Sequence, residues 1–218
     1  MVEGMAVIPE LPRLQPNPEF ARPSTLERLQ LVSEALEKNG FHALIAHGRE
    51  EARRMVLDLV PEGAEVHIGL SETMRELGVT SEIEQSGHYD AIRPKVTQLD
   101  RQTQGREIRK LATAPEYMLG SVHAVTEDGV LVAASGTGSQ LAPYAYGAGK
   151  LVLAVGSHKI VRDVDEALKR VREYSLPMED ARMKSIGRPG SRIGKILLLE
   201  REMPGRVTVI LIDEPVGF

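Results

Sequence analysis

The sequence predicts an α/β protein, and three observations lead to this class. Short apolar runs alternate with amphipathic segments between residues 41 and 77, which is the pattern of βαβ units and of a parallel sheet. A continuous apolar run over residues 151–155 is typical of a strand buried on both faces. The composition, 42% hydrophobic and 27% charged, suits a single domain that buries a sizeable core.

The chain is expected to consist of a proline-rich N-terminal arm, residues 1–23, and one domain, residues 24–218. The prolines of the arm oppose a regular helix, and we expect the arm either to be disordered or to lie on a neighbouring subunit. Ser24, with Glu27 three residues later, forms a capping box that opens the first helix. Asn39-Gly40 ends this helix with a left-handed cap.

The rest of the chain alternates between strands and helices. Strands are expected over residues 41–46, 65–68, 117–126, 130–134, 151–155, 196–200 and 207–212, with a weaker one near residues 89–93. Helices are expected over residues 49–60, 71–77, 101–113 and 163–174. Turn signals predict two hairpins, one across Glu127-Asp128-Gly129 and one across Met203-Pro204-Gly205. The sheet is therefore expected to be mixed but mostly parallel.

The composition excludes several classes of function. The chain contains no cysteine, so it forms no disulfide and ligates neither an iron–sulfur cluster nor a thiolate-bound zinc ion. Its histidines lack partners at metal-ligand spacing, so no metal site is expected. The net charge of −4 opposes binding to nucleic acid or to an anionic membrane. No signal peptide and no apolar run near the roughly 20 residues of a membrane span are present, which predicts a cytoplasmic protein.

Three loops that follow predicted strands are rich in glycine, hydroxyl or basic side chains. Because the carboxyl ends of parallel strands share one rim, we expect these loops to form a single site for a small anionic ligand, such as a phosphate, a carboxylate or a nucleotide. An ordinary turn or a simple helix cap is the structural alternative at each loop. The candidate ligand-binding residues are Gly69, Ser71 and Thr73; Ser135, Gly136, Thr137, Gly138, Ser139 and Gln140; and Ser157, His158 and Lys159.

Other polar residues are weaker candidates. His123 is expected to be a buried, hydrogen-bonded histidine rather than a catalytic base. Glu82 and Glu84 could reach the site if its chemistry used a carboxylate. The basic residues from Arg182 to Lys195 form either a solvated helix end or an anion-receiving edge of the site.

Taken together, these motifs resemble the LUD-domain family of lactate-utilisation proteins over roughly residues 24–215. The segments that carry the resemblance are Glu116–Gly129, Ser135–Ser139, Ser157–Ala167 and Arg206–Glu214, together with Gly69-x-Ser71-x-Thr73. The resemblance implies a three-layer α/β/α sandwich with a mixed, mostly parallel sheet, as in the CoA-transferase and sugar-phosphate isomerase superfamily. Family members accompany L-lactate oxidation to pyruvate, and some are fused to iron–sulfur modules.

The resemblance therefore implies a cluster-free subunit of L-lactate or organic-acid utilisation, with iron–sulfur oxidoreductase subunits as its partners. Two alternatives stay open: a stand-alone enzyme acting on a phosphorylated or CoA-linked metabolite, and a non-catalytic ligand-binding subunit. The sequence does not decide whether the chain is an enzyme, which cofactor it uses or whether it forms a homo-oligomer.

Overall fold

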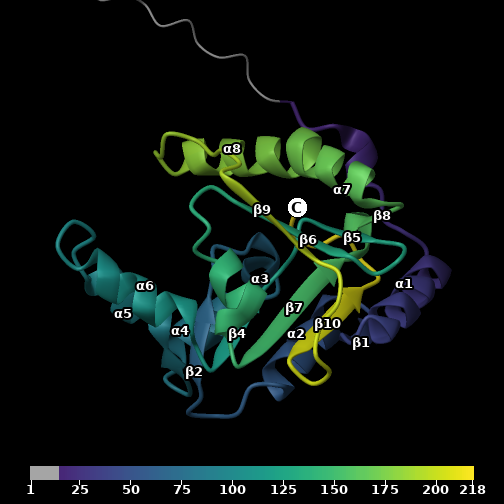
Figure 1. The fold of residues 1–218 in the computed structure, drawn as a ribbon. Coiled ribbons are helices and arrows are strands. Elements are labelled where there is room, and N and C mark those ends of the chain that lie inside the picture. Colours follow the sequence, from purple (N-terminus) through teal and green to yellow (C-terminus); the bar gives the residue numbers. More distant parts are fainter. Residues whose placement is uncertain (1–14) are drawn as a thin grey trace, which may run out of the picture.

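The computed structural model describes residues 15–218, and it confirms the predicted α/β class. Figure 1 shows a central sheet with helices on both sides of it. Most of the predicted N-terminal arm, residues 1–14, lies outside the described residues. The described end of the arm forms a short 3₁₀-helix, η1 (Pro18–Ala21).

The central sheet has six strands, and every pair of neighbours in it is parallel. In spatial order, the strands are β1 (His42–Ala46), β10 (Val207–Ile212), β7 (Lys150–Gly156), β4 (Tyr117–Gly120), β2 (Glu65–Ile68) and β3 (Asp90–Ala91). Since β7, β4 and β2 are neighbours, the loops that leave their carboxyl ends lie close together. This arrangement positions the candidate site.

A second, four-stranded sheet contains the antiparallel pairs. Its order is β8 (Ile160–Val161), β5 (Ala124–Thr126), β6 (Leu131–Ser135) and β9 (Lys195–Leu199). The strand predicted over residues 117–126 is therefore two strands, β4 and β5, which belong to different sheets. The predicted hairpin is correct for β5 and β6 only.

The predicted hairpin across Met203-Pro204-Gly205 is wrong. Strand β9 pairs with β6 in the small sheet, whereas β10 pairs with β1 and β7 in the central sheet. The turn residues connect two sheets instead of two paired strands. A local turn signal reports a change of direction, but it does not report which distant strand supplies the hydrogen bonds.

The helices confirm the expected pattern in outline. They are α1 (Leu26–Lys38), α2 (Arg49–Asp58), α3 (Glu72–Glu76), α4 (Val79–Gln85), α5 (Ile92–Gln98), α6 (Gly105–Thr113), α7 (Val164–Arg170) and α8 (Leu176–Ser185). Helices α4, α5 and α8 were not predicted, and the weak strand near residues 89–93 is only β3 followed by α5. The first helix is capped by the Thr25 hydroxyl, which accepts from Arg28 N at 3.4 Å, and not by Ser24 as the capping box predicted.

Alternation along the strands divides the core between the two faces of the central sheet. Val209 and Leu211 of β10 pack with α1 and the inner face of the small sheet, while Ile210 and Ile212 pack toward α2, α3 and α4. The outer face of the small sheet packs against α7. Helices therefore flank the sheets on both sides, as Figure 1 shows.

A π-helical turn, η4 (Val171–Ser175), joins α7 to α8. Pro177 has no N–H, so it cannot bond the carbonyl of Glu173 four residues earlier. That carbonyl accepts from Asn17 N at 2.8 Å instead, and the Asn17 amide reaches the Glu173 carboxylate at 3.0 Å. The proline thus creates the anchor for the described end of the N-terminal arm.

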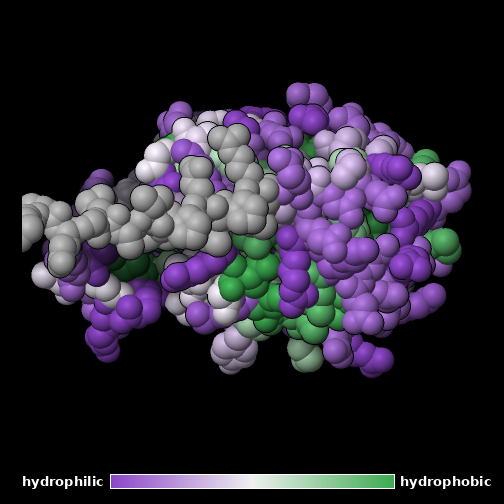
Figure 2. Space-filling view, turned by 90° about the horizontal axis from the view of Figure 1, so that it is seen from above, coloured by the Kyte–Doolittle hydropathy of each residue, from purple (hydrophilic) through white to green (hydrophobic). Residues whose placement is uncertain are grey.

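Figure 2 views the molecule from the side that carries α7 and α8, and this face is mainly hydrophilic with one hydrophobic area near its centre. Among the described residues, none of the helices combines the length and the apolar character that crossing a membrane requires.

Candidate functional site

A cleft of about 240 Å³ lies at the carboxyl ends of β2, β4 and β7. Its walls are the loops that follow these strands, the loop after β6, the start of α8 and the segment before β9. The last residue, Phe218, also lines it. We call this cavity the main cleft. Its location agrees with the general placement of ligand sites at the carboxyl ends of strands in α/β sheets.

Lys159 is the most unusual residue of the main cleft. It ends the short 3₁₀-helix η3 (Ser157–Lys159) after β7, and its side chain is almost fully buried, with 1% exposed. The Lys159 Nζ donates to Thr73 Oγ1 at 2.9 Å and to Ser121 Oγ at 3.1 Å. Burial, followed by the positive charge of Arg170, holds the pKa of Lys159 well below its ordinary value, although Glu76 opposes this.

Arg170 lies behind the wall of the cleft and is fully buried. Its guanidinium donates to the backbone carbonyls of His158 and His123 and to Ser175 Oγ, and it stacks over the Tyr174 ring at 4.9 Å from the centroid. Within residues 15–218 no carboxylate pairs with it, and its Nη2 makes no hydrogen bond. Burial lowers the pKa of Arg170 to about 9, so it remains a cation at neutral pH.

His123 lies in the break between β4 and β5 and lines the main cleft. Its Nδ1 accepts from Ala134 N at 3.0 Å, so the proton of the neutral ring is on Nε2. Burial is the main cause that lowers the pKa of His123 to about 3. The ring is therefore a neutral hydrogen-bond donor, which supports the prediction of a hydrogen-bonded histidine in place of a catalytic base.

The loop after β6 is more self-contained than predicted. Gly138 N donates to Ser135 Oγ at 2.9 Å, and Ser139 N donates to Thr137 Oγ1 at 3.3 Å. Lys195 Nζ braces the loop through the carbonyl of Thr137 at 3.1 Å. Two N–H groups that we expected to face an anion are therefore already bonded, and the loop offers side chains more than backbone donors.

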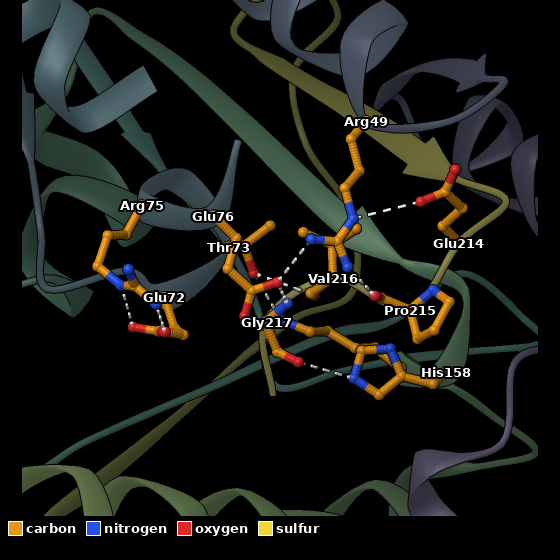
Figure 3. Close-up of polar contacts among 11 residues, drawn as sticks. Arg49, Glu72, Thr73, Arg75, Glu76, His158, Glu214, Pro215, Val216 and Gly217 are labelled. Atoms are coloured by element: carbon orange, nitrogen blue, oxygen red, sulfur yellow. Dashed lines mark hydrogen bonds and ion pairs between the residues drawn. The ribbon is translucent and has the colours of Figure 1, made fainter. Parts of the chain in front are cut away.

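The segment after β10, Asp213–Phe218, passes beside Thr73 and His158 (Figure 3), and its residue Phe218 lines the main cleft. Glu76 and Arg49 hold it from one side: Gly217 N donates to Glu76 Oε2 at 3.2 Å, and Arg49 Nη2 donates to the Pro215 carbonyl at 3.1 Å. His158 Nε2 lies 3.1 Å from the Gly217 carbonyl. Gly217 has φ of +68°, and a Cβ at this position would lie 2.2 Å from Thr73 Oγ1. Only glycine therefore fits here without a clash.

Most of the predicted site residues come together, but not all of them. Ser157 and His158 are buried away from the main cleft, and burial holds the pKa of His158 far below its ordinary value, so His158 is no titratable base at neutral pH. Gly138 forms the turn of its loop at φ +92° without lining the cleft. The residues that do line it are Gly69, Ser71, Thr73, Ser135, Gly136, Thr137, Ser139, Gln140 and Lys159.

The loops do not all converge for the predicted reason, a shared rim of one parallel sheet. The loops after β2 and β7 share the rim of the parallel sheet, but the loop after β6 reaches the cleft from the small sheet. Ser71 uses its hydroxyl to cap α3, accepting from Met74 N at 3.3 Å, as the structural alternative predicted.

Several residues of the site were missed or judged weak in the sequence. Ser121 lies in what was predicted as continuous strand, and Tyr144 holds its backbone by hydrogen bonds of 3.1 Å to both its N–H and its carbonyl. Phe218 and Ser175 also line the cleft, and no local motif identifies them. From the basic cluster, Arg192 lines the cleft, so one member of that cluster does reach the site.

The carboxylates around the cleft already have partners. Glu72 and Glu179 line it, and they pair with Arg75 and Arg182. Glu82 and Glu84, which we considered as reaching the site, pair elsewhere with Arg53 and Arg93 and do not line it. Across residues 15–218 no group of histidine and acidic side chains is arranged to hold a metal ion.

Comparisons with known proteins agree with this architecture. The family model described as the LUD domain matches residues 29–212. The crystal structure of a DUF162 family protein from Deinococcus radiodurans at 1.70 Å resolution is similar, with a TM-score of 0.53 and 14% identity, over 88% of this chain and 99% of that chain. At this identity the likeness concerns the fold alone. The comparison with curated proteins finds no match.

Proposed function

Since the chain belongs to the LUD-domain family, we propose that it binds a small anionic metabolite in the main cleft, as a cytoplasmic, cluster-free subunit of L-lactate or organic-acid utilisation. The observation that carries this proposal is the buried guanidinium of Arg170, which lies behind the wall of the cleft and is a cation at neutral pH. It has no carboxylate partner among residues 15–218. Burying a positive charge is costly unless a counter-charge balances it, and a bound anion supplies that charge.

The size of the cleft supports a small ligand. A volume of about 240 Å³ lies below the roughly 300–1,000 Å³ of pockets that enclose drug-sized molecules, so it suits a carboxylic acid or a short phosphorylated metabolite. The donors that line the cleft are the Nε2–H of His123, the hydroxyl of Ser139, which accepts from Thr137 and keeps its own proton, and the guanidinium of Arg192. Because the chain contains no cysteine, redox chemistry at an iron–sulfur cluster would take place in partner subunits.

Reversible binding to the full chain tests this proposal. Isothermal titration and thermal shift would compare L-lactate, pyruvate, inorganic phosphate, a sugar phosphate, a nucleotide and CoA, with the uncharged amide of lactate as the matched neutral control. We expect a small anion to stabilise the fold and the amide to have no effect. Loss of one charge-assisted hydrogen bond costs about 1.5–3 kcal/mol, so Arg192→Met should weaken binding by roughly ten- to a hundredfold.

The control variant is Lys150→Met, because Lys150 is exposed at the far end of β7 and donates to the Gly205 carbonyl. It should bind like the wild type. If no anion in the panel binds, or if Arg192→Met binds equally well, the proposal is wrong. The link to lactate is tested separately, by adding iron–sulfur oxidoreductase subunits and measuring lactate-dependent electron transfer.

A further inference from the structure

We propose that Lys159 is a nucleophile that forms a Schiff base with an anionic aldehyde or ketone bound in the main cleft. This inference rests on the proposed function, because the ligand it names is one class of the small anions discussed above. It adds a covalent step and a catalytic residue to the site.

The hydrogen bonds around Lys159 Nζ account for its protons. The Thr73 hydroxyl donates to the Val216 carbonyl at 3.4 Å, and the Ser121 hydroxyl donates to the Val122 carbonyl at 3.3 Å. Each hydroxyl has a single proton, so each must accept from Lys159. Two N–H groups of Lys159 are used in this way, and Nζ makes no other hydrogen bond with the residues that the structure describes.

This geometry fits a neutral amine. A neutral amine has two N–H groups, which match the two acceptors, and a lone pair that stays free. An ammonium group would have a third N–H without a partner at a site that is almost completely buried. The lowered pKa of Lys159 agrees with this assignment, and a desolvated neutral lysine is the form that attacks carbonyl carbon.

The step balances without any further reactant. The Lys159 lone pair attacks the carbonyl carbon and forms a C–N bond, while the carbonyl electron pair moves to oxygen. The two amine protons pass to that oxygen, which leaves as water, and a C=N bond remains. Protonation of the imine places a positive charge on nitrogen, and the anionic group of the ligand offsets it. The charge of the ligand thus favours the product.

The other donors of the cleft suit an oxygen on the same carbon. His123 offers Nε2–H and does not become charged at neutral pH, so it can bond the carbonyl oxygen without competing for protons. Thr73 and Ser121 are positioning residues for this step, because their hydroxyls hold the Lys159 Nζ.

Reductive trapping tests the inference. The full chain would be incubated with sodium cyanoborohydride and either pyruvate, a carboxylate ketone, or glyceraldehyde 3-phosphate, a phosphate aldehyde, and the two arms distinguish the anionic groups. Trypsin does not cleave after an alkylated lysine, so an adduct at Lys159 should appear on the uncleaved peptide of residues 151–162. We expect this peptide to carry the dominant adduct with at least one probe.

Three variants sharpen the result. Lys159→Arg has a positive side chain that forms no imine, so it should abolish the adduct. Lys150→Met should keep the adduct at Lys159, now on the peptide of residues 111–162 because the variant lacks the tryptic site at residue 150. Ser121→Ala removes one positioning hydrogen bond and should slow trapping by about two- to tenfold. Because the adduct is mapped on the wild type, the result stands even if a variant fails to fold.

The outcomes separate the inference from the proposed function. L-lactate has no aldehyde or ketone group that an amine could attack. Its binding, measured by titration, therefore tests anion recognition alone. Binding of lactate, pyruvate or glyceraldehyde 3-phosphate without an adduct at Lys159 would overturn the Schiff base and leave the anion site. Adducts spread over the exposed lysines would also overturn it. If neither binding nor an adduct is found, both proposals are wrong.

Discussion

Two basic regions lie close together in this fold, and their charges are balanced in opposite ways. At the rim, Arg49 pairs with Glu76 at 3.4 Å and with Glu214 at 3.3 Å (Figure 3). At the main cleft, Lys159 and Arg170 bond only hydroxyls and backbone carbonyls among residues 15–218. The rim charges are neutralised within the chain, so their role is to hold the segment Asp213–Phe218. The charge of Arg170 is not neutralised within the described residues, so it can attract an anionic ligand.

The largest expected effect is on the cleft side of this comparison. Arg170→Ala removes a fully buried side chain and leaves the carbonyls of His123 and His158 without their donor. We expect a loss of about 3–5 kcal/mol in the free energy of unfolding, measured by urea denaturation, since unsatisfied buried groups and a cavity combine. Arg170→Met, which fills more of the volume, should lose less. A loss below about 1 kcal/mol for Arg170→Ala would mean that the buried charge costs as much as its contacts contribute.

The second effect is a loss in the free energy of unfolding as the pH falls. The pKa of His123 is lowered to about 3 in the folded state from 6.5, so the unfolded chain binds the proton first as the pH falls. His123 therefore costs no stability above pH 6.5, and its cost grows by about 1.4 kcal/mol per pH unit as the pH falls toward 3. His123→Asn keeps an acceptor for Ala134 N but does not titrate, so its stability should fall less steeply with acid.

The alkaline range is the internal control for this experiment. Above pH 7 the unfolding free energies of wild type and His123→Asn should run parallel, because the imidazole is neutral in both states. His67 also has a lowered pKa, about 4, caused by burial and then by Arg93, so the variant retains part of the acid sensitivity. Curves that stay parallel down to pH 4 would show that His123 is more solvated than its position suggests.

The third effect concerns the contact between the two regions. Gly217→Ala places a Cβ against Thr73, and it also disfavours the observed φ of +68°. We expect a loss of about 1–2 kcal/mol in stability. Because Thr73 holds Lys159, anion binding should weaken as well. Gly187→Ala, also at positive φ but with open space around it, is the matched control, and it should lose stability without a change in binding.

Part of this arrangement could be predicted from the sequence. Hydrophobic periodicity located β1, β2, β7 and most helices, because burial on one or two faces leaves a local pattern. The candidate list included Lys159 and Thr73 because they follow strands. Their hydrogen bond could not be predicted, since it joins residues 86 positions apart.

The errors of the sequence prediction also arise from contacts between residues that are far apart in the chain. The separation of β4 from β5, and of β9 from β10, depends on which distant strand supplies the hydrogen bonds. Ser121 was missed because an apolar context hides a short break in a strand. The loop after β6 was expected to bind with its backbone, but Ser135 and Thr137 use their hydroxyls to bond that backbone. Composition reveals that donors are present, but it does not reveal which of them are already satisfied.

The smallest expected effect is on the rim. Arg49→Ala breaks ion pairs that are partly exposed to solvent, with 44% of the Arg49 side chain exposed, so we expect a stability loss below about 1 kcal/mol. High salt should shrink this loss further, because screening weakens exposed pairs. The double variant Arg49→Ala with Arg170→Ala should add the two losses, measured in one urea series, since the residues share no partner. A rim loss as large as that of Arg170→Ala would erase the distinction between charges that hold the fold and charges that await a ligand.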